Sequence, residues 1–94
     1  MKSRWMPRAI VALSRIHEYI ATDNLATADL LRDRVVLFVE TILVVHPAIG
    51  RPGRVDGTRE SVIHSSYIIV YRTKGEVIEI LTIRHVARKW PHQF

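Results

Sequence analysis

Cysteine is absent from the chain, which excludes both a disulfide framework and a thiolate metal site. A long apolar run is also missing. The most apolar stretch, residues 35–45, is interrupted by Glu40 and Thr41 and is too short to span a membrane. The basic start of the chain is not followed by an apolar segment of signal-peptide length. We therefore expect a cytoplasmic protein that acts without a membrane partner.

Internal repeats and low-complexity tracts are absent as well. The 94 residues are enough for one domain and too few for two. The composition, 48% hydrophobic and 24% charged, is typical of a globular protein and not of a disordered one. We expect a single domain over residues 1–94.

The positive charge is unevenly distributed. The formal net charge is +5. Residues 1–46 carry six Lys/Arg and five Asp/Glu, a net of +1, whereas residues 47–94 carry eight and four, a net of +4. A basic half indicates an acidic partner, either nucleic acid or an acidic protein segment, although such charge can also serve solubility alone.

The first half of the chain has the pattern of a short strand, residues 2–5, followed by a helical hairpin. Pro7 suits the first turn of a helix, because its missing N–H costs nothing there. Asn24 has the side chain of an N-cap for a second helix, which ends before Pro47. The apolar positions of the first helix follow at spacings of three and four and predict one stripe, formed by Ile10, Leu13, Ile16 and Ile20.

The second half predicts a loop and three strands. Residues 47–58 hold three of the four glycines and two of the four prolines, which indicates the loop. Apolar-rich segments then predict strands at Arg59–His64, Tyr67–Thr73 and Glu76–Arg84. Lys74-Gly75 fits a two-residue hairpin turn in which the glycine takes a positive φ. The expected fold class is α+β, a helical hairpin packed on an antiparallel sheet in the order β-α-α-β-β-β.

Both faces of this sheet are apolar if Thr73 pairs with Glu76. One face then shows Ile69, Tyr71, Ile78 and Ile80, and the other shows Ile68, Val70, Val77, Leu81 and Ile83. One helical hairpin covers one face. The other is left to the C-terminal tail, a second copy or another protein, unless the helices splay and the loop covers it. We expect a partner-binding surface on that second face, formed by Ile68, Val70, Leu81 and Ile83.

Several local motifs point to a known family. Arg4-Trp5-x-Pro7 opens the chain, Gly50-Arg51-x-Gly53-Arg54 and Gly57-Thr58-Arg59-Glu60 occupy the loop, and His85-x-Ala87-Arg88-x-Trp90-Pro91 follows the last strand. With them, the whole chain resembles the RelE/ParE superfamily of type II toxin–antitoxin toxins, also called plasmid stabilisation proteins. The resemblance implies a growth-inhibiting toxin that forms a hetero-oligomer with an antitoxin of the ParD or RelB kind. Such an antitoxin lays an amphipathic segment, often acidic at its rim, across the toxin.

Two mechanisms divide this superfamily. One branch cuts messenger RNA on the ribosome, and the other, typified by ParE, poisons DNA gyrase and is not known to be an enzyme. RNA cleavage needs an acid, a base and cations around the phosphate. His85 could act as acid or base, and Arg54 and Arg59 could supply charge. The nuclease branch typically has an arginine three residues before a tyrosine of the middle sheet strand, but here Ile68 precedes Tyr71. An apolar side chain cannot bind phosphate as a guanidinium does.

We therefore favour the ParE-like branch, a gyrase inhibitor rather than an enzyme, with no metal or cofactor. A ribosome-dependent mRNA interferase, with catalytic His85, Arg54 and Arg59, is the alternative. A nontoxic binding module with the same fold is a second alternative. His85 also fits a structural role at a strand end, and Arg59 also fits an ion pair within the sheet.

Target recognition is expected in the basic C-terminal segment. It carries Arg84, Arg88 and Lys89, followed by Trp90 as an aromatic anchor, and it holds no acidic residue. Such a segment suits an acidic protein or phosphate surface. A simpler interpretation is that Trp90 packs into the core and the tail only stabilises the fold.

Overall fold

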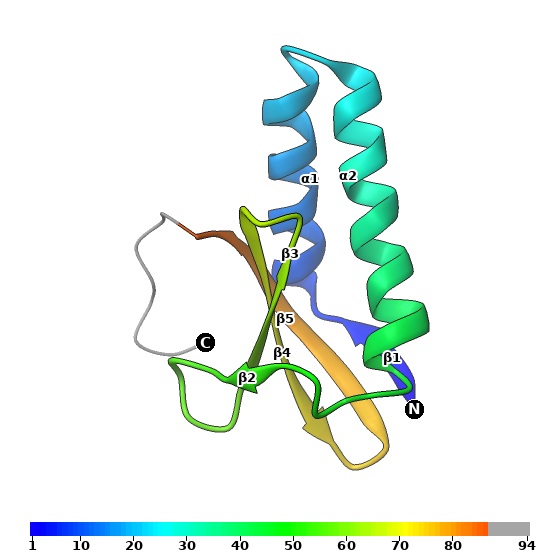
Figure 1. The fold of residues 1–94 in the computed structure, drawn as a ribbon, viewed down its shortest axis with the longest axis vertical. Helices are drawn as coiled ribbons and strands as arrows, with labels where there is room; N and C mark the ends of the chain where they lie inside the picture. The colour runs from blue at the N-terminus through cyan, green and yellow to red at the C-terminus, as the bar shows by residue number, and fades with distance from the viewer. Residues whose placement is uncertain (87–94) are drawn as a thin grey trace.

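The chain folds as two helices beside a five-stranded sheet in the computed structural model, which describes residues 1–86 (Figure 1). The elements are β1 (Lys2–Trp5), α1 (Pro7–Ala21), α2 (Leu25–Phe38), the π-helical turn η1 (Val39–Leu43), β2 (Arg51–Pro52), β3 (Arg59–Ile63), β4 (Tyr67–Lys74) and β5 (Val77–His85). The α+β class and the predicted order of strands and helices are confirmed. The two-residue strand β2 and the π-helical turn were not predicted.

The sheet is mixed rather than purely antiparallel, with the strand order β1-β5-β4-β3-β2. β1 runs parallel to β5, and the other neighbours are antiparallel. The prediction of an antiparallel sheet was therefore wrong at one edge. The physical reason is that a strand joined to the sheet through a long helical connection is free to pair in parallel. β1 is also fastened to η1, because the carboxylate of Glu40 accepts hydrogen bonds from the Ser3 hydroxyl and the Trp5 indole.

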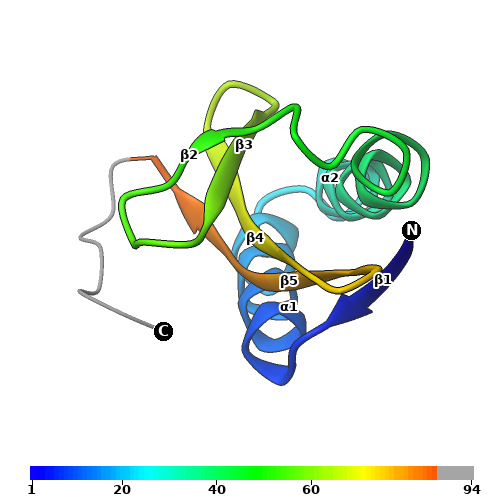
Figure 2. The ribbon, with the colours of Figure 1, turned by 90° about the horizontal axis from the view of Figure 1, so that it is seen from below.

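The helical hairpin covers one face of the sheet, as the view from below shows (Figure 2). The core on this side joins both helices to the central strands β4 and β5. Its buried members are Ala9, Leu13, Leu31, Val35, Val39, Leu43, Ile69, Tyr71, Ile78, Ile80 and Ile83. Three of the four predicted stripe residues of α1 pack here, but Ile10 does not: it is 54% exposed.

The register of the β4–β5 hairpin differs from the prediction by two residues. Tyr71 lies opposite Ile80, not Ile78. Lys74 pairs with Val77, so the turn consists of residues 75 and 76 instead of the predicted 74 and 75. Gly75 has the predicted positive φ, 62°. A register shift of two residues leaves each side chain near the turn on its predicted face of the sheet. Beyond Tyr71 and its partner, however, a β-bulge leaves Leu81 as an extra residue and reverses which side chains of β5 face the helices.

The bulge divides the four residues of the predicted partner-binding surface between the two faces of the sheet. Ile83 packs into the core beneath the helices and not beside Leu81. On the opposite face Ile68, Val70 and Leu81 form a second small cluster, with Met6 packed against it. All three are buried, Ile68 to 1% exposure, whereas Val62, which pairs with Ile68, is 49% exposed.

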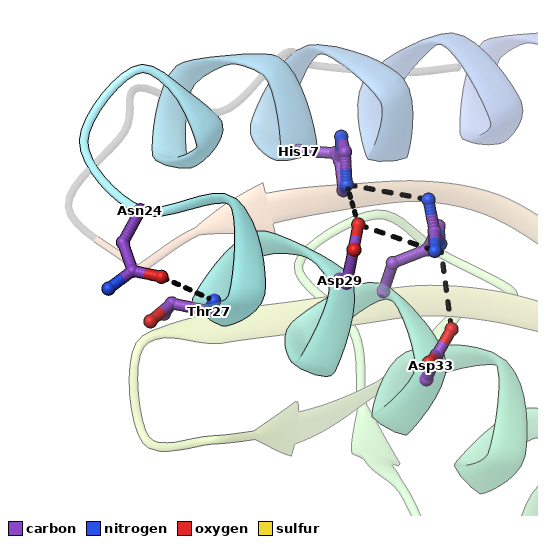
Figure 3. Close-up of polar contacts among 6 residues, drawn as sticks. His17, Asn24, Thr27, Asp29 and Asp33 are labelled. Carbon is purple, nitrogen blue, oxygen red and sulfur yellow. Dashed lines mark hydrogen bonds and ion pairs between the residues drawn. The ribbon is translucent and has the colours of Figure 1, made fainter.

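Polar contacts fasten α1 to α2 (Figure 3). The Asn24 side chain accepts a hydrogen bond from the Thr27 N–H and caps α2 as predicted. Further along the hairpin, Nε2 of His17 on α1 lies 2.7 Å from Oδ1 of Asp29 on α2. Arg32 lies within 3.4 Å of both groups. Within residues 1–86, no helix has the length and apolar character needed to cross a membrane.

Candidate functional site

The loop with the Gly-Arg motif is held in place by Tyr71, a fully buried side chain of β4. The Tyr71 hydroxyl donates a hydrogen bond to the Pro47 carbonyl oxygen and accepts one from the Gly50 N–H, each at 2.9 Å. A Cβ atom at Gly50 would come within 2.5 Å of that hydroxyl. Gly50 is therefore needed so that the backbone of the loop can approach the sheet.

The charged residues of the same motif complete this anchor. Nη1 of Arg59 donates to the Gly50 carbonyl oxygen at 2.7 Å. Glu60, only 2% exposed, accepts hydrogen bonds from the Arg54 N–H at 2.8 Å and from Nη2 of Arg51 at 3.3 Å. The motif thus pairs a buried carboxylate and an arginine with the loop backbone. The Arg59 guanidinium therefore holds the loop through a backbone carbonyl oxygen, which differs from the ion pair within the sheet that was expected.

His85 lies at the opposite end of the sheet from Arg59. Tyr67 pairs with His85, whereas Tyr71 pairs with Arg59. Four residues of β4 separate the two positions, which corresponds to about 13 Å along the strand. Arg54 lies in the loop before β3, at the Arg59 end. The structure therefore does not bring together the three residues proposed as a catalytic group.

The place of the nuclease-branch arginine is filled by a core residue. Ile68 is buried in the cluster with Val70 and Leu81, on the face away from the helices. His85 itself packs edge-on against the Tyr67 ring, with 5.3 Å between the ring centroids. Such a contact orients the imidazole and contributes to packing. Among residues 1–86, no three His, Asp or Glu side chains gather in a way that could hold a metal ion.

A groove of about 860 Å³ runs between α1 and the end of β5, and we call it the basic groove. Arg8 and Arg15 of α1 line it together with Arg84 and His85 of β5. Its other lining residues are Pro7, Val11, Ala12, Ile16, Tyr19, Tyr67, Thr82 and Ile83. None of these residues is acidic. A lining that combines apolar side chains with guanidinium groups suits an amphipathic ligand that carries negative charge.

Arg84 was predicted to bind the target and His85 to act in catalysis, and the two arginines from α1 were not predicted as site residues. Arg8 and Arg15 lie seven residues apart, which places them on the same helix face two turns apart. That spacing was visible in the sequence. It carried no information about which strand the helix would face. Arg88, Lys89 and Trp90, the other predicted target-binding residues, lie outside the described residues.

A second buried carboxylate, Glu79 on β5, has a structural role. Its Oε1 accepts a hydrogen bond from Nε of Arg72 at 2.7 Å, and its Oε2 lies 3.8 Å from Nη1 of Arg4 on β1. The hydrogen bond from Arg72 is the main cause that holds the pKa of Glu79 below its ordinary value of 4.5. Glu79 thereby links three adjacent strands.

Comparison with known proteins gives matches over nearly the whole chain. The family model described as ParE toxin of type II toxin-antitoxin system, parDE, matches residues 3–90. The protein named "Putative toxin Y4kP" from Sinorhizobium fredii (strain NBRC 101917 / NGR234) is 42% identical over 89 residues, which cover 94% of this chain and 91% of that protein.

Two solved structures share the fold. The chromosomal ParDE TA system from P. aeruginosa contains a chain with a TM-score of 0.79 and 27% identity, covering 92% of this chain and 96% of that one. The toxin–antitoxin complex RelBE2 from Mycobacterium tuberculosis contains one with a TM-score of 0.67 and 24% identity, covering 89% and 95%. The second likeness is one of fold alone. The family match and the sequence identity together show that this chain belongs to the ParE toxin family of type II toxin–antitoxin systems.

Proposed function

We propose that this toxin inhibits growth by poisoning DNA gyrase and that a cognate antitoxin neutralises it. The observation that carries the choice of gyrase over messenger RNA is the separation of His85 from Arg54 and Arg59. RNA cleavage requires an acid–base group and phosphate-binding cations around one scissile bond. In this chain the Arg59 guanidinium binds loop carbonyls about 13 Å along the sheet from the imidazole.

Ile68 adds independent support for the gyrase branch. Ile68 is 1% exposed, so a guanidinium at this position would have to leave the buried cluster to reach a phosphate. The fold itself does not distinguish the branches, since it resembles both ParDE and RelBE2 chains.

Growth experiments with the induced toxin test this choice. We expect filamentation and a DNA-damage response, and we expect His85→Ala to remain toxic. Rapid arrest of translation with messenger RNA cut in the ribosomal A-site would overturn the gyrase assignment. In that case His85→Ala should lower cleavage by about 100-fold or more, the effect of losing an acid–base group.

The basic groove is the proposed docking site for the antitoxin. The expected partner segment is amphipathic and acidic, and this groove combines apolar residues with three arginines and a histidine. The groove is favoured over the sheet face that we first considered, because Ile68, Val70 and Leu81 of that face are buried. The ParDE and RelBE2 neighbours come from toxin–antitoxin systems, which supports a protein partner of this kind.

Reversing the charge of the groove tests the docking site. The double variant Arg8→Glu/Arg15→Glu should bind the antitoxin about ten- to 100-fold more weakly. Each charge at the edge of an interface contributes modestly to affinity, and the introduced glutamates would repel an acidic segment. The matched control is Lys74→Glu, an exposed lysine at the far hairpin turn, which should change affinity less than threefold. Equal affinities for the double variant and the control would rule out the basic groove.

A further inference from the structure

The end of the sheet at the β4–β5 turn has a charged face opposite the helices. Glu79 stands between two residues, Ile78 and Ile80, that pack beneath the helices, so its side chain lies on the other face. There it pairs with Arg4 of β1 on one side and with Arg72 of β4 on the other. Paired residues of neighbouring strands share a face, so the carboxylate has a guanidinium on each side.

Two lysines continue this arrangement along the same face. Val77 lies two residues before Glu79 on β5, and it pairs with Lys2 of β1. On its other side Val77 pairs with Lys74 of β4. Residues two apart on a strand share a face, so both lysines lie on the face of Glu79. This end of the sheet points away from the α1–α2 turn (Figure 1). The four cations flank β5 in two pairs, and we call them the cationic quartet: Lys2, Arg4, Arg72 and Lys74.

The quartet has a regular spacing and an excess of positive charge. The two members on each strand are two residues apart, about 7 Å, and β5 separates the two pairs by about 10 Å. Four positive charges and the negative charge of Glu79 leave a net charge of +3 for these five side chains. The side chains of Arg4 and Arg72 are 67% and 43% exposed, whereas that of Glu79 is 4% exposed. The positive groups therefore reach solvent, and the negative one is buried.

Three of the four cations act on this one carboxylate. The hydrogen bond from Arg72 is the largest cause that lowers the pKa of Glu79. The positive charges of Lys74 and Arg4 lower it further. The bond from Arg72 uses Nε, at 2.7 Å, so the two terminal amino groups of this guanidinium can donate to another oxyanion. One buried carboxylate thus positions the guanidinium groups and neutralises only one positive charge.

A duplex phosphate backbone fits the quartet better than a protein surface or a single strand does. The centre of a stable protein interface holds large apolar or aromatic anchors. Between the two pairs lie only a half-buried valine at position 77 and a buried glutamate at position 79. Proteins that bind single strands stack aromatic side chains on the bases, and none of the four members is aromatic. Duplex DNA carries about one charge per 1.7 Å of its axis and binds to exposed cations alone.

We propose that the cationic quartet binds the phosphate backbone of duplex DNA without base specificity. A sheet face that presents guanidinium and ammonium groups contacts phosphates, and phosphates carry no sequence information. The binding itself does not require gyrase. The proposal rests on the proposed function only for its use: gyrase holds a DNA duplex, so a toxin bound to that enzyme would contact protein and DNA together.

Fluorescence anisotropy with the full-length toxin and a short labelled duplex tests the proposal. The variant Lys2→Gln/Lys74→Gln removes two exposed cations and keeps both guanidinium groups beside Glu79, so the fold should be retained. The matched control is Arg32→Gln/Arg34→Gln, which removes the same net charge from exposed positions of α2, on the helix side of the sheet. Circular dichroism and thermal melts establish that both variants fold.

The salt dependence of the affinity reports how many phosphates the toxin neutralises. Each neutralised phosphate contributes about −0.9 to the slope of log affinity against log salt concentration. Between about 50 and 200 mM salt we expect a slope of about −3.6 for the wild type and the control, and about −1.8 for Lys2→Gln/Lys74→Gln. At about 50 mM salt this variant should bind about 100-fold more weakly than the wild type.

Four outcomes would overturn the proposal. Equal slopes for the two double variants would show that net charge and not the quartet determines binding. A larger loss in Arg8→Glu/Arg15→Glu would place the DNA in the basic groove. Tighter binding to single-stranded RNA with the same number of phosphates would overturn the choice of duplex DNA. Unchanged DNA binding by Lys2→Gln/Lys74→Gln together with weaker inhibition of gyrase would assign the quartet to a protein contact.

The proposed function can fail separately from the quartet. A wild-type toxin that binds DNA with the expected slope and leaves gyrase fully active would support DNA binding by the quartet and contradict gyrase as the target. A toxin that inhibits gyrase and does not bind DNA would contradict the quartet as a DNA site and leave the target in place.

Discussion

Replacing Tyr71 by Phe removes one oxygen atom and keeps the ring in the core. The lost hydroxyl joins the Gly50 N–H and the Pro47 carbonyl oxygen, both at 2.9 Å. Gly50 is buried, so its N–H is left without a partner, at a cost of about 1–3 kcal/mol. The Pro47 oxygen is at a partly exposed residue and regains some hydration. We expect a total loss of about 2 kcal/mol, or about 8–16 °C in Tm for a domain of this size.

Thermal and urea unfolding of the purified protein measure this loss. The control is Tyr19→Phe, the same chemical change on a side chain that is 77% exposed, and it should alter Tm by less than 2 °C. Proteolysis should also cut the loop at residues 47–58 faster in Tyr71→Phe than in wild type, because the loop loses two of its tethers. A Tm for Tyr71→Phe within 2 °C of the wild type would show that the hydroxyl does not anchor the loop.

Three further changes test other parts of the account. Asn24→Ala removes the cap of α2 and should cost about 1 kcal/mol in urea unfolding, whereas Asn24→Gly should cost only a few tenths. Ile68→Arg places a guanidinium in a buried apolar cluster and should prevent stable folding rather than create a nuclease, as circular dichroism and an RNA-cleavage assay would show. Stability should fall as pH drops below 4.5, because the lowered folded-state pKa of Glu79 favours the ionised carboxylate; Glu79→Gln should show a smaller decline between pH 7 and pH 3.

Periodicity predicted the elements and left their long-range arrangement open. Pro7 and Asn24 mark helix starts through local backbone chemistry, so those boundaries could be read from the sequence. The parallel pairing of β1 with β5 depends on contacts between residues about 75 positions apart, and no local pattern encodes it. The bulge at Leu81 was missed because alternation of apolar residues looks the same on both sides of a one-residue insertion.

The candidate site was predicted least well where several elements meet. The Gly-Arg motif was noticed, but the partner of Arg59 depended on the position of Gly50, which only the fold supplies. Arg8 and Arg15 were missed because a helical arginine is ordinarily a solvated surface residue, and their meeting with Arg84 requires the packing of α1 on β5. Local motifs therefore indicated the family, and the packing of helix on sheet defined the groove.

A supercoiling assay with purified DNA gyrase, relaxed plasmid and ATP, in the absence of ribosomes, tests most directly whether gyrase is the target. The toxin should inhibit supercoiling, and the His85→Ala variant should inhibit it equally well. Mixing the toxin with the antitoxin beforehand should leave the supercoiling activity of gyrase intact. Full gyrase activity in the presence of the wild-type toxin, together with messenger RNA cut by the same preparation on translating ribosomes, would contradict gyrase as the target.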